Sequence, residues 1–455
     1  MVTFTNSKRT WTGCGVNLWA SEPADKMDAQ LAGLSLAWAR VWIAGNDPGK
    51  AGVFLDDAGM DAVWTNSVQI AQDMIVHTAG VLQKHDIQPV FTMDTAPASW
   101  LVCTRDGKKT LTGTAIVAFA RYWVAAVAVL AKQGVWVKWI EPTNEPNATT
   151  WSQYVAPEDY RLLVWHIRNI SAARCIYGVK IMGPGVSNVL MQAQTNEPWT
   201  SAFASSPYLL DAWNIHAYEF DTSAQETSTL EARRYVRDQM TKNVTIMNAV
   251  SPTLPIHVTE IATKCTVFKD GVRSGNDAPE KIGYAFREID NLCGVIAAGA
   301  TSAFLWQLAT PEWDPTNTMA LYRPDGTKRP HHAAFSAFAN TLPTNGTIYV
   351  DDPLAVGDQT IKALVISNDR FGLVLSRYQD RDRLGGALNI SINTLQEAHL
   401  TFANIHVTAF PATTDVSGVT TRTRSSAGNI TLSLANLPYN AIVFVTGAVL
   451  EFKTC

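Results

Sequence analysis

The sequence predicts an α/β protein in which a (β/α)₈ barrel, the TIM-barrel fold, is followed by a C-terminal antiparallel β-sandwich domain. Between residues 11 and 342, short runs rich in β-branched and aromatic residues alternate with longer segments of helical apolar spacing. From about residue 347 onward, short alternating runs are separated by Gly, Asn, Asp and Pro, which is typical of a sandwich. A chain of 455 residues also exceeds the size at which one hydrophobic core keeps growing, so two domains are expected.

Eight runs in the first part of the chain are interpreted as barrel strands. They are Trp11–Leu18, Leu36–Ile43, Ile87–Met93, Val135–Glu141, Val179–Gly183, Ala212–Ala217, Pro255–Glu260 and Ala300–Gln307. Each run is separated from the next by enough residues for a crossover helix. Eight strands with crossovers predict closure into a barrel rather than an open sheet.

Several of the intervening helices can be recognised in the sequence. Ala115–Gln133 is strongly apolar, Pro157–Ala173 begins with Pro and two acidic residues, and Glu280–Ala298 carries an amphipathic stripe. A last helix is expected at His331–Asn340. The most apolar stretch, Tyr122 to Ala131, is too short to cross a bilayer, so no membrane span is expected.

The second domain is predicted to begin after a linker with the sequence Leu-Pro-Thr-Asn-Gly-Thr. The barrel is assigned to residues 8–342 and the sandwich to residues 343–455, with residues 1–7 as a candidate addition to the sandwich. The predicted sandwich strands include Ile361–Ile366, Gly372–Tyr378, Leu388–Ile392, Ile430–Leu434 and Ala441–Thr446.

Composition and charge exclude several kinds of partner and cofactor. The formal net charge is -4, which argues against binding to nucleic acid or to an anionic membrane. The six cysteines show no CxxC or Cys/His spacing, so no metal site is expected, although their even number permits disulfides. The N-terminus lacks the features of a secretory signal, but several Asn-X-Ser/Thr sequons favour an extracellular or secretory-pathway location.

Two predicted strands end next to a glutamate, at the edge of the barrel where active sites lie. The fourth strand is followed by Asn144-Glu145-Pro, and the seventh ends at Glu260. Hydrolysis of a glycosidic bond needs two such acids: one protonates the leaving oxygen, and the other attacks or activates water. A second Asn-Glu-Pro, at residues 196–198, is predicted to lie in a loop, with Glu197 solvated.

These motifs resemble the clan A glycoside hydrolases over most of the chain. The resemblance implies that Glu145 is the general acid/base, that Glu260 is the nucleophile and that Asn144 binds the sugar 2-hydroxyl. Clan members also place an Arg and a Tyr beside the nucleophile and a Trp under the reactive sugar. Four further positions agree with that pattern, namely Arg40 after the second strand, His216 and Tyr218 after the sixth, and Trp306 near the end of the eighth.

Within the clan, three features are similar to the family of glucosylceramidases, glucuronoxylanases and β-1,6-galactanases. They are the segment Gly13–Ser21, the stretch Asp94–Trp100 and the trailing β-sandwich. The Arg-Val-Trp-Ile motif at Arg40 resembles instead the β-xylosidase/iduronidase or endoglucanase families. Substrate follows family, so the sugar, the linkage and the choice between exo and endo action stay open at this point.

Other strand-end residues are candidates for substrate binding. Tryptophan faces are suited to stacking on sugar rings, and Trp19, Trp42, Trp100 and Trp306 lie at predicted strand ends. Asp94 and Glu219 are candidate hydroxyl binders. Glu141 is interpreted as a hydrogen-bond partner within the site, with the role of the acid as its alternative. An Arg near a carboxylate would keep that carboxylate ionised, which is the role expected of Arg40.

Together these residues predict a retaining glycosidase that uses double displacement on an oligosaccharide, polysaccharide or glycoconjugate, with no metal or organic cofactor. Its two carboxyl groups are expected to lie about 5 to 5.5 Å apart. One alternative is a transglycosylase that uses the same two glutamates with a sugar acceptor in place of water. A second alternative is a catalytically silent carbohydrate-binding barrel, although sugar binding alone does not need two opposed acids.

Overall fold

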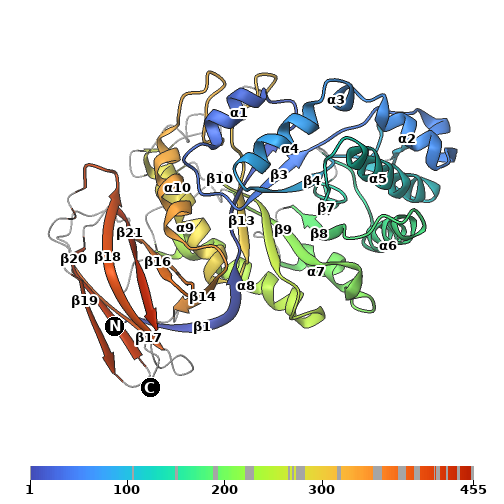
Figure 1. Ribbon diagram of the computed structural model, residues 1–455. Helices are drawn as coiled ribbons and strands as arrows, with labels where there is room; N and C mark the ends of the chain where they lie inside the picture. Colours follow the sequence, from blue (N-terminus) through green and yellow to red (C-terminus); the bar gives the residue numbers. More distant parts are fainter. Residues whose placement is uncertain are drawn as a thin grey trace.

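The protein folds into a closed barrel of eight parallel strands and a nine-stranded sheet that lies beside it (Figure 1). The predicted fold class, a TIM barrel followed by an antiparallel domain, is therefore confirmed. The structure is a computed structural model, and it describes residues 2–104, 107–148, 152–187, 193–220, 230–264, 267–268, 271–272, 282–314, 319–351, 361–377, 386–393, 400–414, 416, 421–426, 429–437 and 441–451.

The barrel strands follow one another around the barrel in chain order, and the eighth pairs with the first to close it. They are β2 (Gly13–Trp19), β3 (Trp38–Trp42), β4 (Gln88–Thr92), β7 (Trp139–Glu141), β8 (Lys180–Val186), β9 (Ala212–Phe220), β10 (Ile256–Lys264) and β13 (Ser302–Leu305). Each predicted run overlaps one of these strands. Large side chains such as Trp38, Trp139 and Phe304 fill the barrel interior, which makes it a packed core and not a pore.

Helices cover the outside of the barrel (Figure 1). They are α1 (Ala24–Leu31), α2 (Asp57–Thr65), α3 (Val68–Ala71), α4 (Met74–Lys84), α5 (Thr114–Lys132), α6 (Pro157–Ala173), α7 (Ala193–Ser201), α8 (Leu230–Val250), α9 (Ile282–Ala297) and α10 (Pro330–Thr341). Short 3₁₀ helices are η1 (Lys50–Phe54), η2 (Ala98–Trp100) and η3 (Pro207–Leu209), and two small hairpins pair β5 (Val102–Cys103) with β6 (Lys109–Thr110) and β11 (Val267–Phe268) with β12 (Gly271–Val272). The first two residues of the predicted helix Glu280–Ala298 lie outside the described residues.

By length and composition alone, α5 could cross a membrane. Most of its side chains are buried within the protein, where the helix packs against α2 and α6. An apolar helix of a barrel's outer layer passes the same test of composition, because it is covered on both sides by its neighbours.

The second Asn-Glu-Pro lies in a helix, so the prediction of a loop there is wrong. Residues 196–198 are inside α7, with Pro198 within the helix. The apolar side chains of Trp199 and Phe203 are buried, and this burial fixes the segment as helical despite the proline. Glu197 is exposed, as predicted for a solvated residue.

The nine-stranded sheet combines the first strand of the chain with the last eight. In order across the sheet, its strands are β18 (Leu400–Phe410), β21 (Ala441–Glu451), β16 (Arg370–Arg377), β15 (Ile361–Ile366), β14 (Gly346–Asp351), β1 (Val2–Trp11), β17 (Gly386–Asn393), β20 (Asn429–Leu437) and β19 (Thr421–Ser426). All neighbours are antiparallel except β1 and β17. The packing of this domain as two facing sheets stays a prediction.

The sequence assigns residues 8–11 to the barrel, whereas in the structure they continue β1 of the sheet. Lys8 has a φ of 58°, and the pairing with β14 shifts register between Asn6 and Thr10. Such a bulge interrupts the two-residue alternation by which one continuous strand would be recognised. Helices α9 and α10 pack against the sheet, which joins the two domains.

Candidate active site

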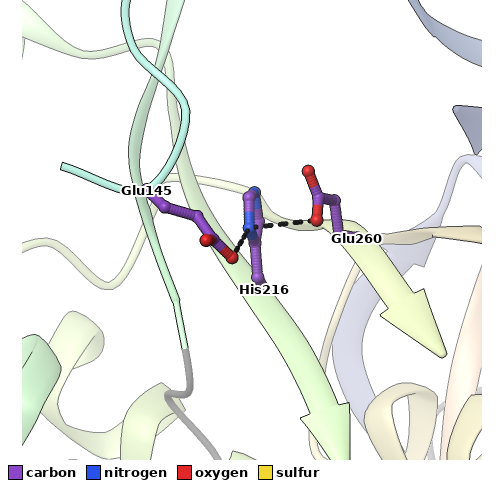
Figure 2. A group of neighbouring side chains, drawn as sticks. All are labelled: Glu145, His216 and Glu260. Carbon is purple, nitrogen blue, oxygen red and sulfur yellow. Dashed lines mark hydrogen bonds and ion pairs between the residues drawn. The ribbon is translucent and has the colours of Figure 1, made fainter. Parts of the chain in front are cut away.

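Glu145 and Glu260 are brought together at the carboxyl ends of the barrel strands (Figure 2). Glu145 follows β7 in a short turn, and Glu260 lies in β10. Both residues are almost fully buried, with exposures of 5% and 3%. One carboxylate oxygen of each, together with a ring nitrogen of His216, lie within 4.8 Å of one another. Two acids separated by more than a hundred residues in the chain therefore share one small buried space.

The backbone at Glu145 has a φ of 40°, in the left-handed region that residues other than glycine adopt at an energetic cost. The turn is held by Asn144, whose backbone N–H donates to the Met93 carbonyl (3.0 Å), and by the Ala148 N–H, which donates to the Glu145 carbonyl (2.8 Å). Such outliers concentrate at functional sites, where the surrounding structure fixes them. Here the turn directs the carboxyl group of Glu145 toward that of Glu260.

Arg40, from β3, is fully buried and links the acids of the site. Its Nε donates to Glu141 Oε2 (2.5 Å), and its Nη1 donates to Glu260 Oε1. Its Nη2 donates to Asn144 Oδ1 (3.0 Å), so the same guanidinium also orients the residue before Glu145. A planar guanidinium with a fixed fork of donors is suited to holding several acceptors at once.

The pKa of the Glu260 carboxyl group is raised, because burial and the charge of Glu145 outweigh the neighbours that favour its ionised form. Burial raises the pKa of its carboxyl group, and the charges of His216 and Arg40 oppose that rise. The Tyr218 hydroxyl, from β9, donates to Glu260 Oε2 at 2.5 Å. This hydrogen bond also lowers the pKa of Glu260, as the charges of His216 and Arg40 do. Each carboxylate oxygen thus accepts a hydrogen bond from a buried side chain.

His216, also from β9, lies between the acids. Its Nδ1 is 3.0 Å from Glu145 Oε1 and 3.4 Å from Glu260 Oε2, and its Nε2 is 3.6 Å from Glu141 Oε1. Burial alone would lower the pKa of His216, but the carboxylates of Glu260, Glu141 and Glu145 raise it to about 9. The imidazole is therefore charged at neutral pH. Glu141 has a lowered pKa despite its burial, chiefly because Arg40 lies against it.

Glu145, His216 and Glu260 also form the one cluster of potential metal ligands among the residues that the structure describes. A metal would need the neutral imidazole, since a protonated ring nitrogen has no lone pair to offer. With the pKa of His216 raised to about 9, a proton occupies that position at neutral pH. A metal ion at this cluster would therefore have to displace that proton at neutral pH.

Gly185, in β8, leaves the space that this cluster needs. A Cβ atom at this position would collide with Glu141 Oε1 and would lie 3.1 Å from His216 Nε2. A residue with a side chain would therefore push the two charged groups out of place.

A cleft of about 270 Å³ opens over the ends of β2, β3 and β4, and neither Glu145 nor Glu260 is among its lining residues. Trp19, Trp42, Asp47, Gln69 and Asp94 are among its lining residues. Asp94 faces the cleft and accepts a hydrogen bond from Asn144 Nδ2 (3.3 Å). Burial raises the pKa of the Asp94 carboxyl group, although the hydrogen bond from Asn144 acts to lower it. The cleft is thereby connected to the turn that carries Glu145.

Four tryptophan rings form a wall that runs from the buried site to the surface. Trp42 and Trp19 stack at 4.9 Å between centroids, and Trp306 meets both edge-on. Trp313 meets Trp19 edge-on at 5.0 Å and is 63% exposed. The Trp19 Nε1–H donates to Gln307 Oε1 (2.9 Å), which fixes the ring in the wall.

The structure brings together most of the residues singled out from the sequence and leaves one apart. Arg40, Glu141, Asn144, Glu145, His216, Tyr218 and Glu260 form the centre, and Trp19, Trp42, Asp94 and Trp306 lie next to it. Trp100 is separate: it is buried, and its Nε1–H donates to the Gly49 carbonyl (2.9 Å). The side chain of Glu219 lies outside the described residues.

Sequence reasoning missed Asn17, Asp47, Gln69 and Trp313. Asn17 lies in β2, and its Oδ1 accepts a hydrogen bond from Arg40 Nη1 at 3.1 Å. Its position in a predicted barrel strand could have indicated that it belongs to the site. Asp47, Gln69 and Trp313 lie on loops or a short helix, where no periodic pattern marks them.

Comparisons with known proteins show which solved structures share this fold. No family model and no curated protein matches the sequence. Among solved structures, the chain is similar to the glycoside hydrolase family 30 subfamily 8 xylanase from Clostridium acetobutylicum, at 13% identity and a TM-score of 0.65, covering 98% of this chain and 99% of that one. The catalytic domain of a family 30 xylanase from Talaromyces cellulolyticus has 14% identity and a TM-score of 0.63, covering 99% and 100%.

An endo-β-1,6-glucanase is similar at 12% identity and a TM-score of 0.62, covering 98% of this chain and 94% of that one. These matches extend over both domains and not the barrel alone. The sequence resemblance to clan A is confirmed at the level of architecture: the chain has the two-domain fold of solved glycoside hydrolases that include family 30 xylanases.

Proposed function

We propose that this protein is a retaining glycoside hydrolase that cleaves its substrate by double displacement through a covalent glycosyl-enzyme intermediate. The observation that carries the proposal is the approach of Glu145 and Glu260, whose nearest carboxylate oxygens lie within 4.8 Å inside a buried site. Retaining enzymes hold their two carboxyl groups about 5 to 5.5 Å apart, whereas inverting enzymes need roughly 6.5 to 9.5 Å for an intervening water. The short separation supports the retaining mechanism.

In the first step, a carboxylate oxygen of Glu260 attacks the anomeric carbon. The bond from that carbon to the leaving oxygen breaks, and Glu145 gives its proton to the leaving oxygen. Arg40 and Tyr218 hold the two oxygens of Glu260 by hydrogen bonds, so the attacking group is oriented before substrate arrives. The products of this step are the released alcohol and a glycosyl ester of Glu260.

In the second step, Glu145 acts as a base and takes a proton from water. The water oxygen bonds to the anomeric carbon from the face that the leaving group vacated, and the ester bond to Glu260 breaks. Two successive inversions restore the original anomeric configuration. His216, charged at neutral pH, lies beside both carboxylates and stabilises the negative charge that moves between them.

The cleft favours neutral sugars as substrates. Asp47 and Asp94 contribute carboxyl groups to its lining, and no Lys or Arg is among the described residues that line it. Carboxylates accept hydrogen bonds from sugar hydroxyls, and they repel a uronic acid. The exposed ring of Trp313 extends the aromatic wall beyond the buried site, which supports binding of more than one sugar unit.

The test is hydrolysis of a panel of aryl glycosides and polysaccharides with analysis of the first product. Aryl β-xyloside, β-glucoside, β-galactoside and α-L-arabinofuranoside are incubated with the protein, and proton NMR identifies the anomer formed before mutarotation. Retained configuration is the expected result, and inverted configuration would refute the mechanism. The variant Glu145→Gln/Glu260→Gln is the control for contaminating activity.

The same assay separates the two rival functions. A transglycosylase would give new glycosides whose yield rises with added acceptor sugar, in place of free sugar. A carbohydrate-binding barrel without catalysis would bind a glycan and release no aryl alcohol from any glycoside in the panel.

We also propose that the protein acts outside the cytosol, where polysaccharides are met. The sequon residues Asn169 and Asn345 are exposed, whereas the sequon residue Asn243 is fully buried and would not accept a glycan in the folded protein. Mass spectrometry of the protein from its natural source is expected to find glycans at Asn169 or Asn345 and none at Asn243. Absence of glycan at both exposed positions would count against this location.

A further inference from the structure

Three aromatic side chains are exposed at the end of the barrel opposite the catalytic acids. Trp136 precedes β7, Tyr177 precedes β8, and Tyr208 lies in η3 just before β9. Their exposures are 82%, 75% and 75%, the highest among the described aromatic residues apart from Phe54. Trp136, Tyr177 and Tyr208 are called the aromatic row below. Exposed apolar side chains that gather on one part of a surface indicate a binding site, whereas single ones do not.

The topology of the barrel places the aromatic row at the starts of three neighbouring strands. Strand β7 pairs with β8, where Trp139 lies opposite Lys180, and β8 pairs with β9, where Met182 lies opposite Ala212. The segments that carry the aromatic row each lead into one of these strands. Residues far apart in the chain thus come to lie at the same end of three adjacent strands.

A single guanidinium fixes two of these segments. Arg168, in α6, donates from Nη1 to the Val179 carbonyl (2.9 Å) and from Nε and Nη2 to the Leu209 carbonyl. Its Nη2 also donates to Asp211 Oδ2 at 2.5 Å. The loop that carries Tyr177 and the 3₁₀ turn that carries Tyr208 are therefore held in place before any ligand arrives, which reduces the entropic cost of binding.

A hollow of about 160 Å³ lies at the base of Tyr177. Arg168, Ser171 and Gly178 are among the residues that line it, together with apolar side chains such as Ile167 and Ile176. A ligand bound at Tyr177 would thus contact an exposed aromatic ring and, next to it, a recess with polar and apolar walls. This combination of surfaces suits a sugar, which has apolar faces and polar edges.

We propose that the aromatic row is a second, non-catalytic binding site for a carbohydrate polymer. The choice of this ligand rests on the proposed function, since a hydrolase of polysaccharides meets such a polymer at high local concentration. The row lies on the opposite face of the barrel from the acids, so it does not supply a further subsite of the cleft. It anchors the protein to an insoluble polymer and raises the effective concentration of bonds to be cleaved.

The experiment compares the triple variant Trp136→Ala/Tyr177→Ala/Tyr208→Ala with the unmodified protein. Sedimentation with insoluble xylan and with insoluble β-glucan measures binding, and a small soluble aryl glycoside measures the chemistry. Binding of the unmodified protein to at least one polymer is expected, and the triple variant should bind that polymer at least about tenfold more weakly. Its kcat/KM on the aryl glycoside should remain unchanged, because none of the three residues touches the site.

Trp165→Ala is the matched control, because Trp165 is an aromatic residue of α6 with 43% exposure that lies outside the row. This variant should bind the polymer as the unmodified protein does. Equal binding by the triple variant and the unmodified protein, an equal loss in Trp165→Ala, or no binding of the unmodified protein to either polymer would overturn the inference. Binding that depends on the row without hydrolysis of any glycoside would instead refute the proposed function and leave the second site standing.

Discussion

The Nδ1 atom of His216 lies 3.0 Å from Oε1 of Glu145, and both residues are almost fully buried. Since the pKa of His216 is raised to about 9, the imidazole is charged at neutral pH and donates its proton to this contact. The group expected to exchange a proton with substrate is therefore held by a neighbour whose own charge depends on pH.

Glu145→Ala should separate the two steps of the reaction. Activated aryl glycosides, whose leaving group needs no proton, are expected to form the glycosyl-enzyme at a useful rate, whereas natural glycans should not react. The intermediate should then accumulate, because water lacks its base. A burst of aryl alcohol and the mass of the covalent adduct are the measurements. Equal loss of activity on both substrate types would show that the roles are misassigned.

Glu260→Ala should abolish turnover of activated and natural substrates alike, by about 10⁴-fold or more, since the attacking atom is gone. Addition of azide or formate should restore activity on the aryl glycoside and give a product of inverted configuration. Proton NMR of that product identifies its anomer. Appreciable turnover without added anion would remove Glu260 from the role of nucleophile.

The stability of the protein should fall between about pH 6.5 and 9 because of His216. Its pKa is raised to about 9 in the folded protein and is about 6.5 in the unfolded chain, so its contribution is complete below about pH 6.5 and is lost as the pH rises through 9. The loss over this interval is on the order of 3 kcal/mol. Urea unfolding of His216→Gln should lack this component, so its difference from the unmodified protein narrows as pH rises. A constant difference would contradict the raised pKa.

The buried carboxyl group of Glu288 is expected to give a second, separate dependence of stability on pH. It is buried in α9, and neither carboxylate oxygen has a hydrogen-bond partner among the described residues. Burial raises its pKa well above the usual value, so the folded protein keeps a proton that the unfolded chain releases above about pH 4.3. Stability therefore falls as pH rises, by about 1.4 kcal/mol for each unit by which the pKa is raised.

Glu288→Gln should remove that dependence and increase the free energy of unfolding at pH 8 more than at pH 5. Thermal unfolding at both pH values gives the comparison. Glu197→Gln, which replaces an exposed acid of α7, is the control and should leave the stability unchanged at both pH values. A Glu288→Gln variant no more stable at pH 8 than the unmodified protein would show that the carboxyl group is ionised and paired.

Trp313→Ala should discriminate between short and long substrates. The ring is 63% exposed at the outer end of the tryptophan wall, so its removal should leave the fold and the aryl monoglycoside reaction unchanged. The kcat/KM for an oligosaccharide should fall by about three- to tenfold, through loss of one stacking contact. Phe54→Ala removes an even more exposed ring outside the cleft lining and should have no such effect. Equal losses on both substrates would exclude an outer sugar-binding role for Trp313.

The sequence predicted the fold and the centre of the site more fully than the cleft around it. Barrel strands such as β3 and β10 are short apolar runs, and the residues at their ends follow from strand position, which is how Arg40 and Glu260 were found. Loop conformation brings Asp47 into the cleft lining and the Trp313 ring against Trp19, and no periodicity encodes either position. Trp100 has the sequence position of a site residue, but its indole N–H is used by the Gly49 carbonyl in the core.

The place of β1 in the sheet bears on how the protein is assembled during synthesis. The strand lies between β14 and β17, and its Ser7 hydroxyl donates to the Ile348 carbonyl, 341 residues away. Strand β1 must therefore wait, unpaired, until the segments that follow the barrel have been made, whereas barrel strands find partners earlier. Contacts of such long sequence separation form slowly, and an exposed strand edge is prone to pair with another chain. Completion of this sheet is accordingly expected to be a late event of folding, and a chain that ended after the barrel would leave β1 with an open edge.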